Sequence, residues 1–568
     1  MRNNALKWFL FILPLVIFIT ALGICLPSKN NALFVFINLS YYIFLILLCL
    51  WSVYTVFFLK EIKPLALFKE NWIGIVSAII LTAICFFFID SWFRLLSDET
   101  NLLSVAQSMA LQKKVFLTKM GRIINGDLYP ITYTTPKRPL LFSFVVSLVH
   151  NVCGYSFENA FRVNLFSLFS ILVLTFIAVK RLTSIPVAIS TQILIMSQPA
   201  IPLHATSAGF DLFSALFFWL SIFSVYIFMQ KRDVSSFSFL WCNLLMFANI
   251  RYESFFFMVL IIVFLGFLKY LKKEFLIKNS FLLGVSPLLF LPRILQTWIS
   301  TKGLVENPEG IPSFSVDHFL TNTAIFIKSQ FDFSRILPYA TVLNLISFLL
   351  LFIILILFIT KNFTPIRKWQ KHFVFLAALC LSGIFAIFLP YYMGNYAHPA
   401  TIRFFLIPVI LLSLIPAFYY FLKPGKIKGL IICCLSVLSF SFYFPVAINN
   451  RLLDSQFGIQ HLRESYTFLK KQGAISPLII SDTPSQFIPF NFSAIDFKTA
   501  NLHKHRILKE LSGQVYENIF VFQFVPPETK KPIDINALDT EFKLLPVHSF
   551  KSLTGNDVRI SKVILNGP

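Results

Sequence analysis

The chain has 568 residues, of which 57% are hydrophobic and only 13% are charged, and its formal net charge is +23. A soluble globular domain carries roughly 25% charged residues, so the composition excludes an ordinary soluble protein. It indicates a polytopic membrane protein, in which the many Lys and Arg residues mark cytoplasmic loops and do not form a surface for nucleic acid.

Thirteen apolar segments are candidate membrane spans, because a spanning helix needs about 20 mostly apolar residues. They lie at 8–26, 32–59, 72–92, 160–179, 185–203, 210–229, 236–250, 254–271, 280–298, 337–359, 373–392, 404–422 and 429–447. The first segment has a basic start but no clear small-residue cleavage site, so we interpret it as a membrane helix and not as a removed signal.

The loops between these segments set the orientation. Short loops with clusters of Lys and Arg alternate along the chain with short loops that carry few. Because such clusters stay in the cytoplasm, we expect the N-terminus inside and, after an odd number of spans, the C-terminus outside. The stretch 139–154 would reverse the alternation if it spanned, but it is only about 15 residues long, so we expect an interfacial or re-entrant helix on the outer leaflet.

The tail has a different composition from the rest of the chain. Short apolar runs bounded by turn residues, at 476–482, 493–497, 518–525 and 558–565, are typical of strands, and a helical stretch lies at 503–514. The predicted fold class is therefore an all-α polytopic membrane protein with a small extracytoplasmic α/β domain. The predicted boundaries are 1–447 for the transmembrane domain and 448–568 for the tail.

An acidic pair, Asp98 and Glu99, directly follows the third predicted span. The topology places it on the outer face, near the start of a loop that covers 93–159. The loop continues with an amphipathic stretch at 104–119, which we expect to lie at the membrane interface. A helix-capping role is the simplest interpretation of such an Asp, and only the downstream motifs favour a catalytic one.

The order of these motifs resembles the outer-face loop of the lipid-linked-sugar glycosyltransferases of the GT-C fold, in particular the protein O-mannosyltransferases and the aminoarabinose transferase that modifies lipid A. In that family an acidic pair opens the loop, a Lys-Pro-Pro-Leu motif starts an interfacial helix that ends near Phe-Gly, and an arginine begins a span that ends in basic residues. The matching positions here are Asp98-Glu99, Lys137-Arg138-Pro139-Leu140, Cys153-Gly154, Arg162 and Lys180-Arg181. The sequence departs from the pattern at Arg138, which replaces a proline, and at Asn101, where the aminoarabinose transferase has an arginine.

The resemblance implies a membrane glycosyltransferase that moves a sugar from a polyprenyl phosphate to an acceptor. One catalytic carboxylate with no covalent partner suggests a direct displacement with inversion at the anomeric carbon. Such a reaction needs a base for the acceptor hydroxyl, and it needs positive charge where the phosphate gains negative charge. We predict Asp98 as the general base and Glu99 as an orienting residue or an acceptor contact.

Four further positions complete the predicted site. Asp211 begins a predicted span, where a carboxylate is costly, so we expect it to contact the acceptor or to partner the base; stabilisation by the helix dipole is the alternative. The predicted donor-phosphate ligands are Lys137, Arg138, Arg251 and Arg403. The simpler alternatives are contacts of Lys137 with lipid headgroups and an ion pair between Arg251 and Glu253.

No metal or other cofactor is expected. The implied partners are a polyprenyl-phosphate-linked sugar, an envelope glycan, lipid or protein acceptor, and the bilayer, without nucleic acid. A composition rich in Lys, Asn and Phe suggests an AT-rich bacterial genome and thus a bacterial inner membrane. A transporter or lipid flippase is the main alternative, although the sequence lacks the repeated halves typical of transporters; a non-catalytic scaffold of the same fold is another.

Overall fold

The computed structural model describes residues 2–62, 64–300, 312–335, 338–360, 368–398, 400–449, 459–473, 477–526, 537–551 and 557–565. Contacts within the chain divide it into two compact units. We call Met1–Trp92, Lys137–Phe142 and Phe161–Asn450 the membrane unit, and Phe93–Pro136, Ser143–Ala160 and Arg451–Pro568 the sheet unit.

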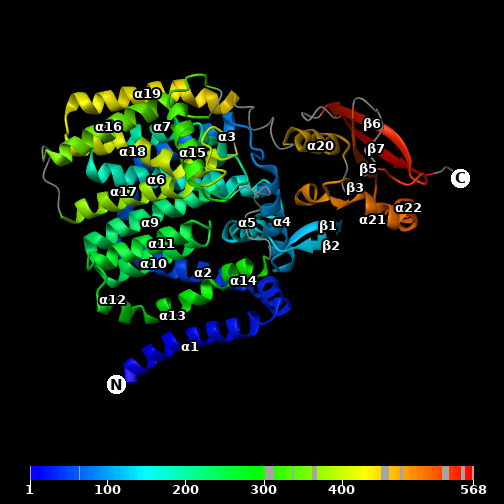
Figure 1. The fold of residues 1–568 in the computed structure, drawn as a ribbon, viewed down its shortest axis with the longest axis horizontal. Helices are drawn as coiled ribbons and strands as arrows, with labels where there is room; N and C mark the ends of the chain where they lie inside the picture. The colour runs from blue at the N-terminus through cyan, green and yellow to red at the C-terminus, as the bar shows by residue number, and fades with distance from the viewer. Residues whose placement is uncertain are drawn as a thin grey trace. The chain divides into compact units, whose positions relative to one another are not determined.

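The membrane unit consists of apolar helices, many of which run side by side (Figure 1). Ten segments in the described part of the chain are long and apolar enough to cross a membrane, so the chain is an integral membrane protein, as predicted. The helices of this unit are α1 (Arg2–Cys25), α2 (Lys29–Ile62), α3 (Pro64–Phe88), α6 (Asn159–Leu182), α7 (Ile185–Met196), α8 (Ala200–Ala205), α9 (Asp211–Lys231), α10 (Val234–Ala248), α11 (Ser254–Phe267), α12 (Lys273–Lys278), α13 (Ser280–Leu289), α14 (Leu291–Ile299), α15 (Val316–Ser329), α16 (Thr341–Ile359), α17 (Lys368–Phe388), the 3-10 helix η1 (Ile402–Phe405), α18 (Leu406–Leu422) and α19 (Lys426–Asn449).

Each of the thirteen predicted spans falls on one or two of these helices, but three fall on helices shorter than expected. Helix α7 has 12 residues, α10 has 15 and α11 has 14. At 1.5 Å per residue these helices are roughly 18 to 23 Å long, less than the roughly 30 Å of a hydrocarbon core. The predicted span at 185–203 was too long because the apolar pattern continues through the turn at Pro199 into α8.

The sheet unit contains most of the loop after the third span. Its helix α5 (Leu141–Cys153) has 13 residues, which is shorter than a full membrane span, and the interfacial position expected for 139–154 stays a prediction. The predicted interfacial stretch at 104–119 is wrong: it covers the end of α4 (Leu96–Gln112) and the start of strand β1 (Leu117–Ile124). Thirteen of the 17 residues of α4 are buried, since the helix packs against β1 and the tail, so it has no broad face for lipid.

The sheet has seven strands in the order β2-β1-β4-β3-β5-β7-β6. Strand β1 and strand β2 (Asp127–Thr134) form a hairpin whose turn, Asn125-Gly126, has positive φ at both residues, as a type I′ turn requires. The tail supplies β3 (Leu478–Ile480), β4 (Ser493–Ile495), β5 (Ile519–Val525), β6 (Lys543–Lys551) and β7 (Asp557–Ile564). Four of these strands were predicted; β6 was not.

The predicted domain boundaries separate the loop 93–159 from the tail 448–568, whereas in the structure strands from both form one sheet. Strand β1 pairs with β4 through Gly121 and Ala494, and the backbone N–H of Ile123 donates to the Ser493 hydroxyl (2.8 Å). The start of the predicted tail includes residues 450–458, which lie outside the described residues.

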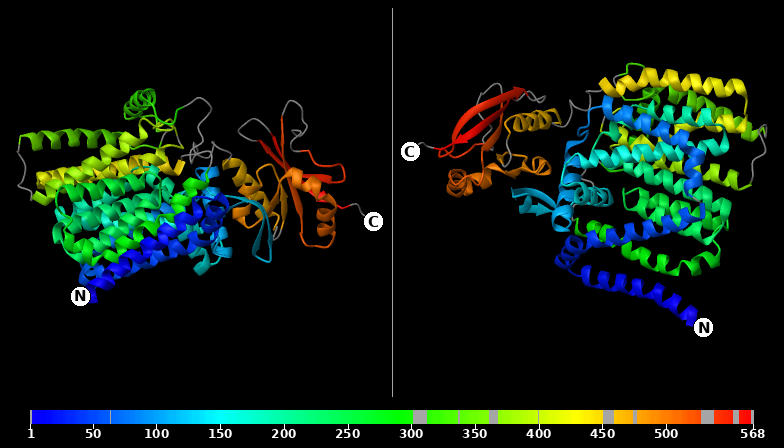
Figure 2. Two further views of the ribbon diagram at one scale, coloured as in Figure 1. Left: turned by 60° about the horizontal axis from the view of Figure 1, so that its bottom comes forward. Right: turned by 180° about the vertical axis from the view of Figure 1, so that it is seen from behind.

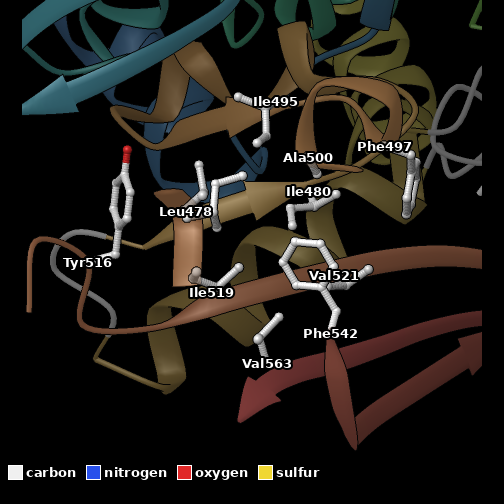
Figure 3. Close-up of a cluster of buried hydrophobic side chains, with 11 residues drawn as sticks. Leu478, Ile480, Ile495, Phe497, Ala500, Tyr516, Ile519, Val521, Phe542 and Val563 are labelled. Carbon is white, nitrogen blue, oxygen red and sulfur yellow. The ribbon is translucent and has the colours of Figure 1, made fainter. Parts of the chain in front are cut away.

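Helices cover both faces of the tail sheet. Alternate residues of β5 point to opposite faces. Phe520 contacts Phe468 of α20 (Ile459–Lys471), whereas Ile519 and Val521 pack in a core with Ile507 of α22 (Lys504–Ser512) and with α21 (Phe497–Leu502). Figure 2 shows these helices on the two sides of the sheet, and Figure 3 shows the apolar core around Leu478, Ile480 and Val563. The predicted α/β character of the tail is confirmed.

Candidate functional site

The acidic pair lies in the first turn of α4, where the helix dipole favours negative charge. Both residues are buried: Asp98 is 7% exposed and Glu99 is 1% exposed. The Glu99 carboxylate accepts hydrogen bonds from the backbone N–H groups of Arg94 and Leu95, each at 3.2 Å. As in one half of a capping box, this carboxylate satisfies N–H groups at the helix start and fixes the turn that carries Asp98.

Three of the residues predicted for the site meet in the membrane unit. Asp211 is the first residue of α9, Arg251 lies in the turn between α10 and α11, and Arg403 lies in η1. All three are less than 10% exposed, and they line one cavity of about 10 Å³ together with Glu253. That volume is at the lower limit of what a single water needs.

The Arg251 guanidinium is engaged on two sides. Its Nη1 forms an ion pair with Asp211, and its Nε forms one with Glu253. Arg251 and Arg403 also lie over the ring of Phe404, with guanidinium carbons 5.2 and 5.1 Å from the ring centroid. The cluster therefore contains two carboxylates and two guanidinium groups, and its formal charges balance.

The other two predicted cations, Lys137 and Arg138, are held through their backbone. The Tyr252 hydroxyl donates to the Lys137 carbonyl, and the Gln296 side-chain amide donates to the Arg138 carbonyl (2.9 Å). Lys137 is exposed and Arg138 is half-buried. Their side chains thus extend from a segment whose backbone is fixed.

Helix α14 connects these two groups of cations. Arg293 of α14 donates to the backbone carbonyls of Ala248, Arg251 and Tyr252, while Gln296, one turn later, holds Arg138. The sequence patterns did not indicate Arg293, Gln296, Tyr252 or Phe404 as site residues. Arg293 could have been found, because it is an arginine inside the predicted span 280–298, where a charge is costly and usually functional.

The predicted site is therefore divided between the two units: Asp98 and Glu99 belong to the sheet unit, and Asp211, Lys137, Arg138, Arg251 and Arg403 belong to the membrane unit. In the described part of the chain, no group of three or more His, Cys, Asp or Glu residues has the geometry of a metal site.

Comparison with known proteins identifies the fold. No protein-family model matches the sequence, and no curated protein sequence matches it significantly. Among solved structures, the chain is similar to ArnT from Cupriavidus metallidurans, both bound to undecaprenyl phosphate (TM-score 0.52) and in the apo state (TM-score 0.53). Each match has 12% sequence identity and covers 88% of this chain and 99% of ArnT.

The chain thus has the GT-C fold, as the motifs of the first loop predicted. A third structure, the arabinosyltransferase EmbB from Mycobacterium smegmatis, matches with a TM-score of 0.29, 11% identity and coverage of 67% of this chain and 40% of EmbB, which is too weak to carry an argument.

Proposed function

We propose that this protein is a membrane glycosyltransferase that moves a sugar from a polyprenyl phosphate to an acceptor on the outer face of the membrane. The observation that carries the proposal is the buried carboxylate of Asp98 in a helical turn that the neighbouring Glu99 holds in place. The fold shared with ArnT, one of whose structures contains undecaprenyl phosphate, supports the donor class.

In the proposed reaction Asp98 takes the proton of the acceptor hydroxyl while the hydroxyl oxygen attacks the anomeric carbon of the sugar. The bond between that carbon and the phosphate oxygen breaks, and polyprenyl phosphate leaves with the electron pair. No general acid is required, because the phosphate is a good leaving group. A single displacement inverts the configuration at the anomeric carbon.

The cationic residues have the complementary role of stabilising the leaving phosphate. Lys137 and Arg138 would contact it directly from their fixed backbone segment. Arg251 and Arg403 would offer guanidinium N–H donors but no net charge, because Asp211 and Glu253 balance them. Asp211 forms an ion pair with Arg251, so we assign it to holding that guanidinium, in place of a direct contact with the base or acceptor.

The proposed setting is a bacterial inner membrane with undecaprenyl phosphate as carrier. The acceptor would be a lipopolysaccharide, another envelope glycan or a protein, reached from outside.

The test is turnover by purified protein in lipid with a panel of radiolabelled polyprenyl-phosphate sugars and an envelope extract. Asp98→Asn should lower transfer by about 100-fold or more, because removal of a general base typically costs 10²–10⁴-fold, while the donor still binds. Asp90→Asn is the matched control, since Asp90 is an exposed carboxylate just before the same loop.

The two ways of failing have different meanings. Transfer that survives Asp98→Asn would remove Asp98 from the reaction and keep the enzyme class. The absence of both donor binding and turnover in the wild type would favour the transporter or the non-catalytic scaffold interpretation.

A further inference from the structure

One group of aromatic rings in the sheet unit connects three distant parts of the chain. Phe93 precedes α4, Phe157 follows α5, Tyr466 lies on α20, and Phe490 ends the 3-10 helix η3 (Ile488–Phe490), followed closely by Phe492. We call these five residues the aromatic cluster. Phe490 is its centre, because its ring contacts those of Phe93, Phe157, Tyr466 and Phe492 at centroid distances of 5.8, 4.9, 4.7 and 6.4 Å.

A hydrogen bond connects the tail segment around Phe490 to the loop 93–159. The Tyr155 hydroxyl donates to the carbonyl of Pro489 (2.7 Å), directly before Phe490. Burial raises the pKa of Tyr155, so the hydroxyl keeps its proton and remains a donor. Helix α4 packs against η3 and against the preceding 3-10 helix η2 (Pro484–Gln486). The segment 484–490 therefore packs against α4 and is hydrogen-bonded to the loop at Tyr155.

One short stretch of backbone links the aromatic cluster to the acidic pair. Phe93 is fully buried, and the next two residues, Arg94 and Leu95, provide the N–H groups that bind Glu99. A movement of the Phe93 ring would change the positions of these N–H groups. It would therefore change the turn that carries Asp98.

We infer that the C-terminal tail is a positioning element for the acidic pair, and that Phe490, through Phe93, Arg94, Leu95 and Glu99, holds the first turn of α4 in place. The role of this turn in catalysis rests on the proposed function; the positioning itself does not. In enzymes a misplacement of about 1 Å can cost roughly 100-fold in rate, so a contact that never touches substrate can control turnover.

The predicted position of the tail on the outer face would allow it to contact the acceptor. The ring contacts give it a second role that needs no acceptor contact: the tail carries Phe490 and Tyr466, and without them Phe93 and Phe157 would lose their partners from the tail.

The test compares Phe490→Ala with Phe520→Ala in the full-length protein in lipid nanodiscs. Phe520 is a buried ring in the same tail, but it packs against Phe468 of α20 and has no ring contact with the aromatic cluster among the described residues. Phe490→Tyr keeps the ring and should behave as the wild type. Phe490→Leu and Tyr466→Leu replace Phe490→Ala if that variant does not fold.

Hydrogen exchange of the amides at 93–100 is the first readout. We expect Phe490→Ala to accelerate it by about tenfold or more and Phe520→Ala to leave it unchanged, because only the first variant releases the turn. The second readout is transfer kinetics: Phe490→Ala should lower kcat by about 100-fold while the KM for the donor stays within about twofold.

Equal exchange at 93–100 in the two Ala variants would overturn the inference, and so would an unchanged kcat in Phe490→Ala. If the wild-type protein transfers no sugar, the proposed function fails, but the exchange measurement still decides whether the tail holds the turn.

Discussion

At the scale of single residues, the buried guanidinium of Arg251 in the membrane unit is paired with two carboxylates. Arg251 forms ion pairs with Asp211 and Glu253, although both Asp211 and Arg251 are less than 10% exposed. Removing one partner of a buried pair is costly because the other charge remains without compensation. The pairing therefore makes Asp211 and Arg251 interdependent.

This interdependence can be measured with a double-mutant cycle on the unfolding of the purified protein in detergent. Arg251→Gln should destabilise the protein by about 3 kcal/mol or more, since it leaves the buried Asp211 and the half-buried Glu253 without that partner. Asp211→Asn combined with Arg251→Gln should cost clearly less than the sum of the single variants. The control is Arg162→Gln, at an exposed arginine. If the losses of unfolding free energy in the Asp211 and Arg251 variants were additive, the two residues would not be coupled.

Sequence reasoning found Asp211, Arg251 and Arg403 one at a time, because a charge beside an apolar run is conspicuous. It could not show that they meet, because they lie on α9, the turn after α10, and η1, and no periodicity relates positions so far apart. It also missed Tyr252 and Gln296, whose polar side chains act by binding backbone carbonyls of Lys137 and Arg138. Such contacts depend on tertiary packing and leave no pattern in the sequence.

At the scale of elements, the long apolar helices could be predicted because a long run of apolar residues is enough to indicate a membrane helix. The loop after the third span could not. The stretch 104–119 has the polar and apolar alternation of a surface helix, but tertiary contacts bury α4 and draw the end of the stretch into β1. Strand β6 was missed because most of its residues are exposed and Pro546 interrupts it.

The packing of α1 on α13 depends on a single glycine. A Cβ at Gly284 would lie 2.4 Å from the backbone oxygen of Phe11, so the two helices approach too closely there for any side chain. Figure 1 shows α1 running along α13. Gly284→Ala should push α1 away, lower the melting temperature and accelerate tryptic cleavage after Lys29, at the start of α2.

Gly23→Ala is the matched control, because a Cβ at Gly23 of α1 meets no atom within 4 Å. Alanine favours a helix over glycine by about 1 kcal/mol, so this variant should be neutral or slightly stabilising. If Gly284→Ala behaved like Gly23→Ala, α1 would not be held by that contact.

At the scale of the whole molecule, the three short helices decide which side of the membrane each loop faces. Helices α10 and α11 are consecutive, so if both failed to cross, the later loops would keep their sides. Helix α7 has no such partner, because α8 after it has only six residues. If α7 does not cross, every loop after it changes side.

The proposed site requires α7 to cross. Asp98 precedes α7 in the chain, whereas Asp211 follows it at the start of α9, and they can serve one reaction only if both face the same side. With the N-terminus inside, we expect a phosphatase fused after Arg232 or after Gly425 to be inactive and one fused after Leu565 to be active, because the basic loops stay in the cytoplasm. Phosphatase activity after Arg232 would place Asp98 and Asp211 on opposite faces and would exclude a shared site.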